Sequence, residues 1–126
     1  MATPADRKYS ESHEWHKADG DVVTLGITEF AVEQLTDVTF VEMKPVGTSI
    51  EAGDVVGEVE SVKTTSDIYC HVSGEVVEVN EALADEPAML NEDPYEKAWL
   101  CRIKTTDVSK LDALADAAAY DSEHAV

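Results

Sequence analysis

Residues 55–79 read VVGEVESVKTTSDIYCHVSGEVVEV and contain three successive runs of residues that favour β-strands. These runs, at 55–62, 68–72 and 75–79, are rich in valine and isoleucine, whose branched side chains pack well on a pleated sheet. Between the first two runs lies Lys63-Thr64-Thr65-Ser66-Asp67, a polar stretch of the kind found in turns. The segment therefore predicts a β-hairpin with Lys63 at its tip.

The chain on either side continues this pattern of short strands. Residues 22–27 and 38–43 are rich in β-branched residues and predict two more strands. Residues 99–104 alternate, which places Trp99, Cys101 and Ile103 on one face. The connections are too short for repeated crossover helices, so antiparallel pairing is favoured. Together these runs predict a mainly β sandwich or flattened barrel.

Short helices are expected at the edges of this β-structure. Thr28 is a suitable N-cap for a helix over 29–35, because its hydroxyl can accept a bond from the first helical turn. Residues 81–90 predict a short helix that is interrupted at Pro87. A capped C-terminal helix and tail are predicted over 109–126.

The length and composition fit one folded domain. The chain has 126 residues, of which 44% are hydrophobic and only 6% aromatic, so aliphatic side chains must fill most of the core. We expect a single domain over 1–126, with a loose N-terminal leader at residues 1–8. Trp15 and Trp99 are predicted to anchor the core.

The charge of the chain excludes several classes of partner. Lysine and arginine number 9 and aspartate and glutamate 27, so the net charge is −18 with histidine neutral. Phosphates would be repelled, which argues against binding nucleic acid or an anionic membrane through charge. The acidity also suggests adaptation to high salt, where screening weakens self-repulsion. Thermal unfolding compared at low and molar salt tests that hypothesis.

The cysteines and the apolar pattern point to a reduced, cytoplasmic protein. Cys70 and Cys101 are too few for a disulfide scaffold and lack C-x-x-C spacing, so they are predicted to be buried small hydrophobic residues. No apolar segment follows the basic pair near the N-terminus, as a secretory signal would require. No stretch approaches the roughly 18 apolar residues of a membrane span.

No metal site is expected. His13, Glu14 and His16 are close in sequence, but the H-E-x-x-H signature is absent, and a strand would place the two histidines on opposite faces. Cys70 and His71 could join them only as distant additional ligands, and zinc needs three or four.

Lys63 is the residue that draws attention to a function. It is one of seven lysines in a very acidic chain and lies at the polar tip of an otherwise apolar hairpin. A solvated turn lysine would explain this equally well. The alternative is that the amine is acylated by an enzyme, which would replace its charge by an amide and add a long arm. A covalent carrier would also explain the lack of a catalytic motif elsewhere.

An ordered set of motifs resembles one known family. Glu60-Ser61-Val62-Lys63, Ser66-Asp67-Ile68-Tyr69 and residues 72–80 look like the lipoyl-lysine region of the glycine cleavage system H protein. Residues 9–15, 26–28, 34–35, 40–42 and 91–100 match in order and spacing, so the resemblance spans roughly residues 7–120. The chain departs from the family at Cys70-His71, where a Ser-Pro pair is more usual, and at Thr64, where alanine is common.

The resemblance implies a barrel-sandwich hybrid fold, like that of lipoyl and biotinyl carriers, with one N6-lipoyl group on Lys63. It implies a carrier, not an enzyme, whose lipoyl disulfide accepts the aminomethyl group of glycine. The implied partners are glycine decarboxylase (P protein), aminomethyltransferase (T protein), dihydrolipoamide dehydrogenase (L protein) and a lipoylating enzyme. No nucleic acid or membrane partner is implied, and we expect a monomer. By the same resemblance, Ser12, Glu14 and Asp67 line a cleft that stabilises the loaded amine.

Other functions are compatible with parts of the sequence. An H-like relay could donate lipoyl groups to other complexes, and sequence alone separates it poorly from the glycine cleavage carrier. The lipoyl domain of a 2-oxoacid dehydrogenase and the biotin carriers are shorter, and biotin carriers tend to place Met beside the lysine. An enzyme with Lys63 as Schiff-base nucleophile would need a desolvated pocket, which the polar tip disfavours. A plain interaction domain is the remaining alternative.

Overall fold

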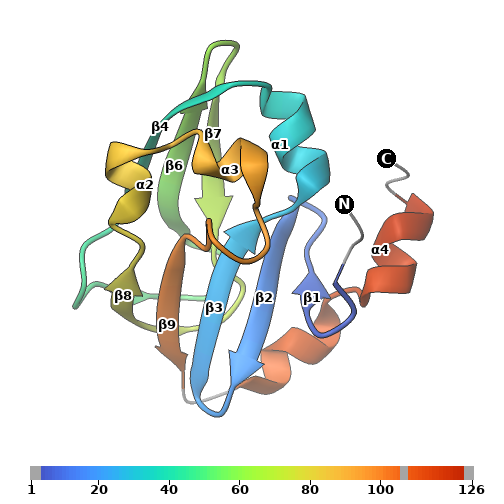
Figure 1. Cartoon of the computed structure of the whole chain (residues 1–126). Coiled ribbons are helices and arrows are strands. Elements are labelled where there is room, and N and C mark those ends of the chain that lie inside the picture. Colours follow the sequence, from blue (N-terminus) through green and yellow to red (C-terminus); the bar gives the residue numbers. More distant parts are fainter. Residues whose placement is uncertain (1–3, 106–107, 124–126) are drawn as a thin grey trace.

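The computed structural model describes residues 4–105 and 108–123, whose strands form two antiparallel sheets that share one core (Figure 1). One sheet has the strand order β1-β2-β3-β9-β8-β5 and the other β4-β6-β7. The strands are β1 Lys8–Tyr9, β2 Glu14–Asp19, β3 Val22–Ile27, β4 Val38–Met43, β5 Ser49–Ile50, β6 Val55–Ser61, β7 Thr65–Tyr69, β8 Gly74–Val79 and β9 Cys101–Thr105. The predicted antiparallel sandwich is therefore confirmed.

Helices flank the sheets as the sequence predicts. They are α1 Glu29–Leu35, α2 Ala82–Asp85, α3 Met89–Glu92, the 3₁₀ helix η1 Val108–Ala113 and α4 Ala117–Glu123. The Thr28 hydroxyl accepts a bond from the Ala31 N–H at 3.3 Å, so the predicted cap is confirmed. The interruption between α2 and α3 falls at the predicted proline.

Aliphatic side chains fill the space between the sheets, as the composition predicts. Cys70 and Cys101 are both fully buried there. A second cluster of buried aromatic residues lies outside the sandwich; it consists of Tyr9, Trp15, Tyr95 and Tyr120. Trp15 is thus confirmed as an anchor, but of this outer cluster.

The prediction for Trp99 is wrong in part. β9 begins at Cys101, so Trp99 precedes the strand and does not share its inward face. Leu100 is fully buried, whereas Trp99 is only half-buried, and the Arg102 guanidinium lies 4.0 Å from the centre of its ring. A cation over an indole face is favourable at the surface, which explains this position.

The C-terminal segment is not one helix. Ala115 pairs with Tyr9 of β1 through two backbone hydrogen bonds of 2.8 and 2.9 Å, which requires extended backbone and ends η1. The Asp116 carboxylate then accepts a bond from the Ala119 N–H at 2.9 Å, as a cap does, and α4 follows. Residues 124–126 of the predicted tail lie outside the described residues.

The N-terminal segment is not loose from Arg7 onward. Arg7 is buried, its guanidinium donates to the Tyr95 carbonyl and to Glu96, and it lies 4.4 Å from the centre of the Trp15 ring. Lys8 belongs to β1, opposite His16. Residues 1–3 of the predicted leader lie outside the described residues.

The strand predicted at 68–72 begins and ends earlier. β7 covers Thr65–Tyr69, because Thr65 and Ser66 still pair with β6. After Tyr69 the Cys70 backbone bonds to Gly53 and Asp54 instead, and the chain crosses to the other sheet.

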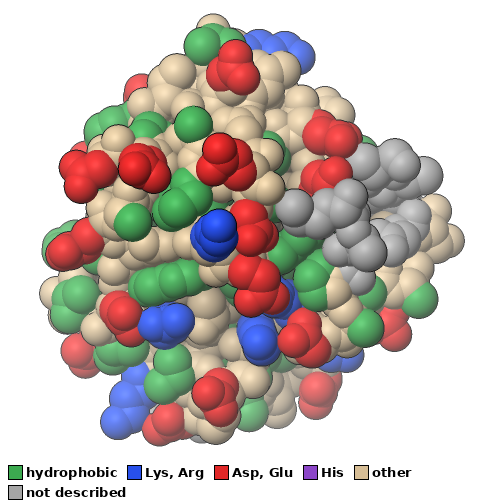
Figure 2. Space-filling model, viewed as in Figure 1, with side chains coloured by type: hydrophobic (Ala, Val, Ile, Leu, Met, Phe, Trp, Pro, Cys, Tyr) green, Lys and Arg blue, Asp and Glu red, His purple; other side chains and the backbone are tan. Residues whose placement is uncertain are grey.

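No helix among the described residues is long and apolar enough to span a bilayer. Acidic side chains are spread over the face shown in Figure 2 rather than gathered in one patch.

Candidate functional site

The tip of the β6–β7 hairpin presents Lys63 to solvent. Ser61 and Thr64 close the turn: the Ser61 N–H donates to the Thr64 carbonyl at 2.8 Å, and the Thr64 N–H donates to Ser61 Oγ at 3.1 Å. The Lys63 N–H also donates to Ser61 Oγ, at 3.2 Å. The Val62 N–H bonds to the Asp37 carbonyl at 3.1 Å, which ties the tip to the start of β4. The backbone of the tip is thereby fixed, while the Lys63 side chain is exposed.

Glu14, at the start of β2, is a fully buried carboxylate with many donors. Its Oε1 accepts from Ser10 Oγ at 2.6 Å and from Ser12 Oγ at 2.5 Å, and lies 3.0 Å from His71 Nε2. Its Oε2 accepts from the Tyr69 N–H at 3.3 Å, at the end of β7. A buried carboxylate needs such donors to offset its loss of hydration. The bond to Tyr69 also places β2 beside the return strand of the hairpin.

A tight turn before β2 brings the two serines to Glu14. The His13 N–H bonds to the Ser10 carbonyl at 3.1 Å, and His13 has a positive φ of 71°. Asparagine, aspartate and histidine are the non-glycine residues that most often adopt this conformation. Nδ1 of His13 lies 2.8 Å from the hydroxyl oxygen of Tyr120, within hydrogen-bond distance, so α4 contacts the same turn.

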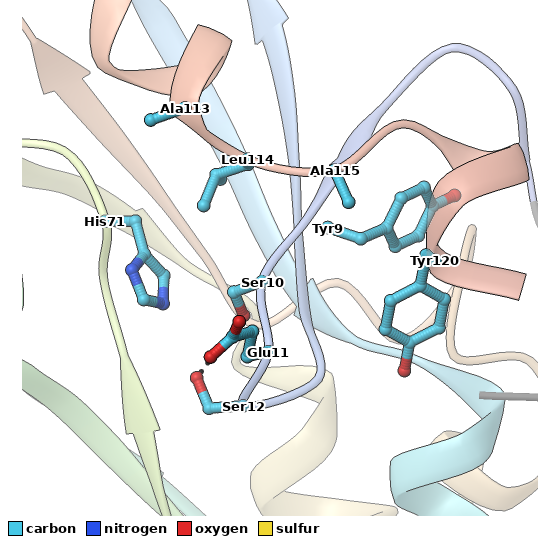
Figure 3. A pocket seen from close by; sticks show the side chains of 9 residues that line it. All are labelled: Tyr9, Ser10, Glu11, Ser12, His71, Ala113, Leu114, Ala115 and Tyr120. Carbon is cyan, nitrogen blue, oxygen red and sulfur yellow. Dashed lines mark hydrogen bonds between the residues drawn. The ribbon is translucent and has the colours of Figure 1, made fainter. Parts of the chain in front are cut away.

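Two cavities meet at Ser12. The larger, of about 570 Å³, lies between the turn before β2, His71 and the C-terminal segment (Figure 3). In Figure 3 the His71 ring and the Ser12 side chain both point into it. The smaller, of about 310 Å³, is lined by Ser12, by α1 and by Thr64, Thr65 and Ser66 of the hairpin. Ser12, which donates to Glu14, therefore lines both the cavity beside the hairpin and the cavity beside His71.

Of the predicted site residues, the structure brings Ser12 and Glu14 together and places Asp67 apart from them. Asp67 lies opposite Glu58 of β6, which lies opposite Glu42 of β4, and all three are exposed. Its neighbours Ser66 and Ile68 line the smaller cavity, so strand alternation turns Asp67 to the outer face. A role for Asp67 in the cleft stays a prediction.

His16 is held neutral beside this cluster. Burial, and then the proximity of His71, lower the pKa of His16 to about 3. Its Nε2 accepts from the His71 N–H at 3.1 Å, so in the neutral ring Nδ1 carries the proton. Among residues 4–105 and 108–123, no group of three or more His, Cys, Asp or Glu side chains is arranged to hold a metal ion.

The thiol of Cys70, seven residues from Lys63, should be inert toward disulfides and alkylating agents. Burial raises the pKa of Cys70 to about 11, and the thiol donates to the Val72 carbonyl at 3.2 Å. The thiolate, which is the reactive form, is therefore scarce at pH 7–8. We expect no labelling of native protein by iodoacetamide at pH 7.5, but labelling of both cysteines in denaturant. Rapid labelling of Cys70 in the native protein would show that the thiol is accessible.

Sequence reasoning missed Ser10, His71 and Tyr120 as parts of this region. The position of Ser10, four residues before Glu14, carries no signal, because the contact depends on the turn between them. His71 was considered only as a distant metal ligand and as a departure from the family pattern. Tyr120 reaches the cleft because the break at Ala115 redirects the chain, and the sequence does not show that break.

Comparisons with known proteins show which chains this one is similar to. The family model described as Glycine cleavage H-protein matches residues 7–125. A glycine cleavage system H protein of Staphylococcus haemolyticus (strain JCSC1435) is 52% identical over 120 residues, 95% of each chain. That of Bacillus licheniformis is 49% identical over 121 residues, 96% of this chain and 95% of the relative. A crystal structure of the H protein from Mycobacterium marinum matches with a TM-score of 0.89 at 42% identity, over 98% of this chain and 100% of that chain.

These matches also bear on the fold and its site. The near-complete structural match confirms the predicted barrel-sandwich fold with short flanking helices. The matched region contains the hairpin with Lys63 and the turn with Ser12 and Glu14. Since both the family model and the relatives cover nearly the whole chain, this protein belongs to the glycine cleavage H-protein family.

Proposed function

We propose that Lys63 carries the lipoyl group of this protein and that the whole chain is a single carrier domain. Membership of the family makes the chain a lipoyl carrier of the glycine cleavage system. The observation that supports Lys63 as its attachment site is an exposed lysine on a hydrogen-bonded turn, next to a cavity that is lined by Thr64 and by Ser12, a partner of Glu14. Bound lipoate supplies a disulfide that takes up the aminomethyl group of glycine and passes it on.

The hairpin suits acylation by an external enzyme. The bonds among Ser61, Thr64 and Asp37 fix the backbone at the tip, so the attachment point is presented in one place. The side chain of Lys63 reaches solvent, where a lipoylating enzyme can approach it. A long tether from this point raises the local concentration of its cargo at each partner in turn.

The buried carboxylate suits the storage of a cationic cargo. A primary amine is an ammonium near pH 7, and a carboxylate flanked by hydroxyls holds such a group by charge-assisted hydrogen bonds. Glu14 and Ser12 provide this combination: Ser12 lines both cavities, and its hydroxyl donates to the buried Glu14 carboxylate behind it. Asp67, exposed on the outer face of the same hairpin, adds negative charge near the tip. We assign all three residues to the retention of the cargo.

The partners follow from the same proposal. The chain is a substrate that visits glycine decarboxylase, the aminomethyltransferase and dihydrolipoamide dehydrogenase, and it catalyses none of these reactions itself. Adding the lipoylated protein to those three enzymes should restore glycine decarboxylation. If it restores none, but donates lipoyl groups to other complexes, the protein is a lipoyl relay instead.

Replacing Glu14 by glutamine should leave lipoylation intact but release the cargo amine faster. Glutamine keeps the shape of the side chain and removes the charge that pairs with the ammonium, so we expect a roughly tenfold faster loss, as for one lost charged hydrogen bond. The rate of amine release from loaded protein measures this. Glu58→Gln, at an exposed acid on the outer face of β6, is the matched control. Equal release from both variants and the parent would refute the role of Glu14.

A further inference from the structure

One oxygen of the Glu14 carboxylate, Oε1, already has three partners in the structure. Ser10, Ser12 and His71 all contact Oε1, and the Tyr69 N–H bonds to Oε2. Because Oε1 already has three partners and Glu14 is buried, an ammonium that binds Oε1 takes the place of one of these donors. Which donor leaves decides how strongly the cleft holds a cation.

His71 is the donor best placed to leave. Ser10 is buried, and its Oγ also accepts from the Glu14 N–H at 3.0 Å, so the backbone holds it in place. Ser12 lies in the tight turn, 3.3 Å from Ser10 Oγ. The side chain of His71 is 27% exposed and lines the larger cavity (Figure 3). It also makes the longest of the three contacts to Glu14 Oε1, at 3.0 Å.

We propose that His71 is the resident partner of Glu14 that a primary ammonium displaces, so that His71 sets the affinity of the cleft for its cargo. This inference rests on the proposed function and adds a residue that governs specificity. The His71 ring, when protonated, offers Glu14 the same charge and N–H donor as the cargo does. The ring therefore competes with the ammonium for one carboxylate.

The groups around His71 make this competition sensitive to pH. Glu11, Tyr9 and Tyr120 line the same cavity, Glu14 lies behind it, and no lysine or arginine is among its lining residues in the described chain. The buried ring of His16 lies 5.3 Å from that of His71, edge to face. Histidines ordinarily change charge between pH 5 and 8. A charged His71 ring binds the Glu14 carboxylate more strongly than a neutral ring does, so the cleft holds ammonium less tightly wherever His71 is charged.

Methylammonium chloride, titrated into the unlipoylated protein at constant ionic strength, tests the inference directly. The signals of the His71 ring and of the Ser12 amide are followed by NMR at pH 7.5 and pH 6.0. We expect both signals to shift together and to saturate, with a higher half-saturating concentration at pH 6.0 than at pH 7.5. Tetramethylammonium, which has no N–H group, should produce no saturable shift.

Two variants test whether ammonium displaces His71 from Glu14 or only binds near it. His71→Gln keeps a side chain that can donate but is neutral at every pH, so its half-saturating concentration should be equal at the two pH values. Glu14→Gln should bind no methylammonium. The inference is overturned if His71→Gln keeps the full pH dependence, if the His71 ring does not respond while the Ser12 amide does, or if the parent shows no saturable shift.

Failure of this inference is distinguishable from failure of the proposed function. The titration needs no lipoyl group, whereas the proposed function depends on acylation of Lys63. A protein that is lipoylated at Lys63 but whose His71 ring does not respond would keep the carrier role and lose the competition. An unlipoylated Lys63 with a responsive His71 would leave a cation site and no carrier.

Discussion

Replacing Lys63 by arginine should abolish lipoylation and all carrier activity. A guanidinium retains the positive charge but is not a substrate for amide formation with lipoate, so no arm can be attached. The fold should be unaffected, because the side chain is exposed and the turn is closed by Ser61 and Thr64. We expect no gain in mass after incubation with a lipoylating enzyme and lipoate, and a free energy of unfolding within about 0.5 kcal/mol of the parent.

Lys104→Arg provides the matched control for this loss. Lys104 is an exposed lysine in β9, far along the chain from the hairpin. The control variant should gain one lipoyl group at the same rate as the parent. If Lys63→Arg were still acylated, or if Lys104→Arg lost the modification, the attachment site would have to be another lysine.

Replacing Gly26 by alanine should destabilise the fold strongly, because the added methyl group would collide with Trp15. A Cβ at position 26 would lie 2.4 Å from Cε2 and Cζ2 of Trp15 and 2.6 Å from its Nε1. Trp15 is buried and its Nε1 donates to the Pro94 carbonyl at 3.0 Å, so the ring cannot easily move away. Overpacking of this kind costs about 3 kcal/mol, or a fall in Tm of about 10 °C.

A double variant tests this cause specifically. Trp15→Phe removes the indole atoms nearest to the new methyl group, so it relieves the collision. In the Trp15→Phe background, Gly26→Ala should cost less than about 1 kcal/mol, which corresponds to a coupling energy of about 2 kcal/mol. Thermal or denaturant unfolding gives the free energy of unfolding of the parent, the two single variants and the double variant, and so the coupling energy. Additive effects would mean that the methyl group acts through something other than Trp15.

Local sequence patterns predicted most of the β-structure. The valine-rich runs at 22–27, 38–43 and 75–79 became β3, β4 and most of β8, because these residues suit a pleated surface with one buried face. Thr28 capped α1 as expected, since a cap depends only on residues a few positions away. The hairpin tip at Lys63 followed from the contrast between its polar residues and the apolar runs beside it.

Features that depend on contacts between distant segments escaped prediction. The break at Ala115 exists because β1 pairs with it, more than one hundred residues away in sequence, and no local pattern encodes that pairing. Arg7 is buried because Tyr95, Glu96 and Trp15 surround its guanidinium.

In the candidate site, too, the contacts between distant segments could not be predicted from local sequence patterns. Ser12 and Glu14 were expected in the cleft only through the family resemblance, and the structure adds Ser10 and His71 as their partners. The link from Glu14 to His71 joins β2 to the crossing after β7, so it requires the tertiary fold. Asp67 illustrates the opposite case, because alternation along β7 places it on the outer face.

The central claim is that the amine of Lys63 bears a lipoyl arm in the living cell. Intact mass measurement of the protein from its native source, followed by peptide mapping, tests this claim most directly. The account predicts one lipoyl group per chain, located on the peptide that contains Lys63. A free amine at Lys63, biotin in place of lipoate, or a lipoyl group on another lysine would contradict it.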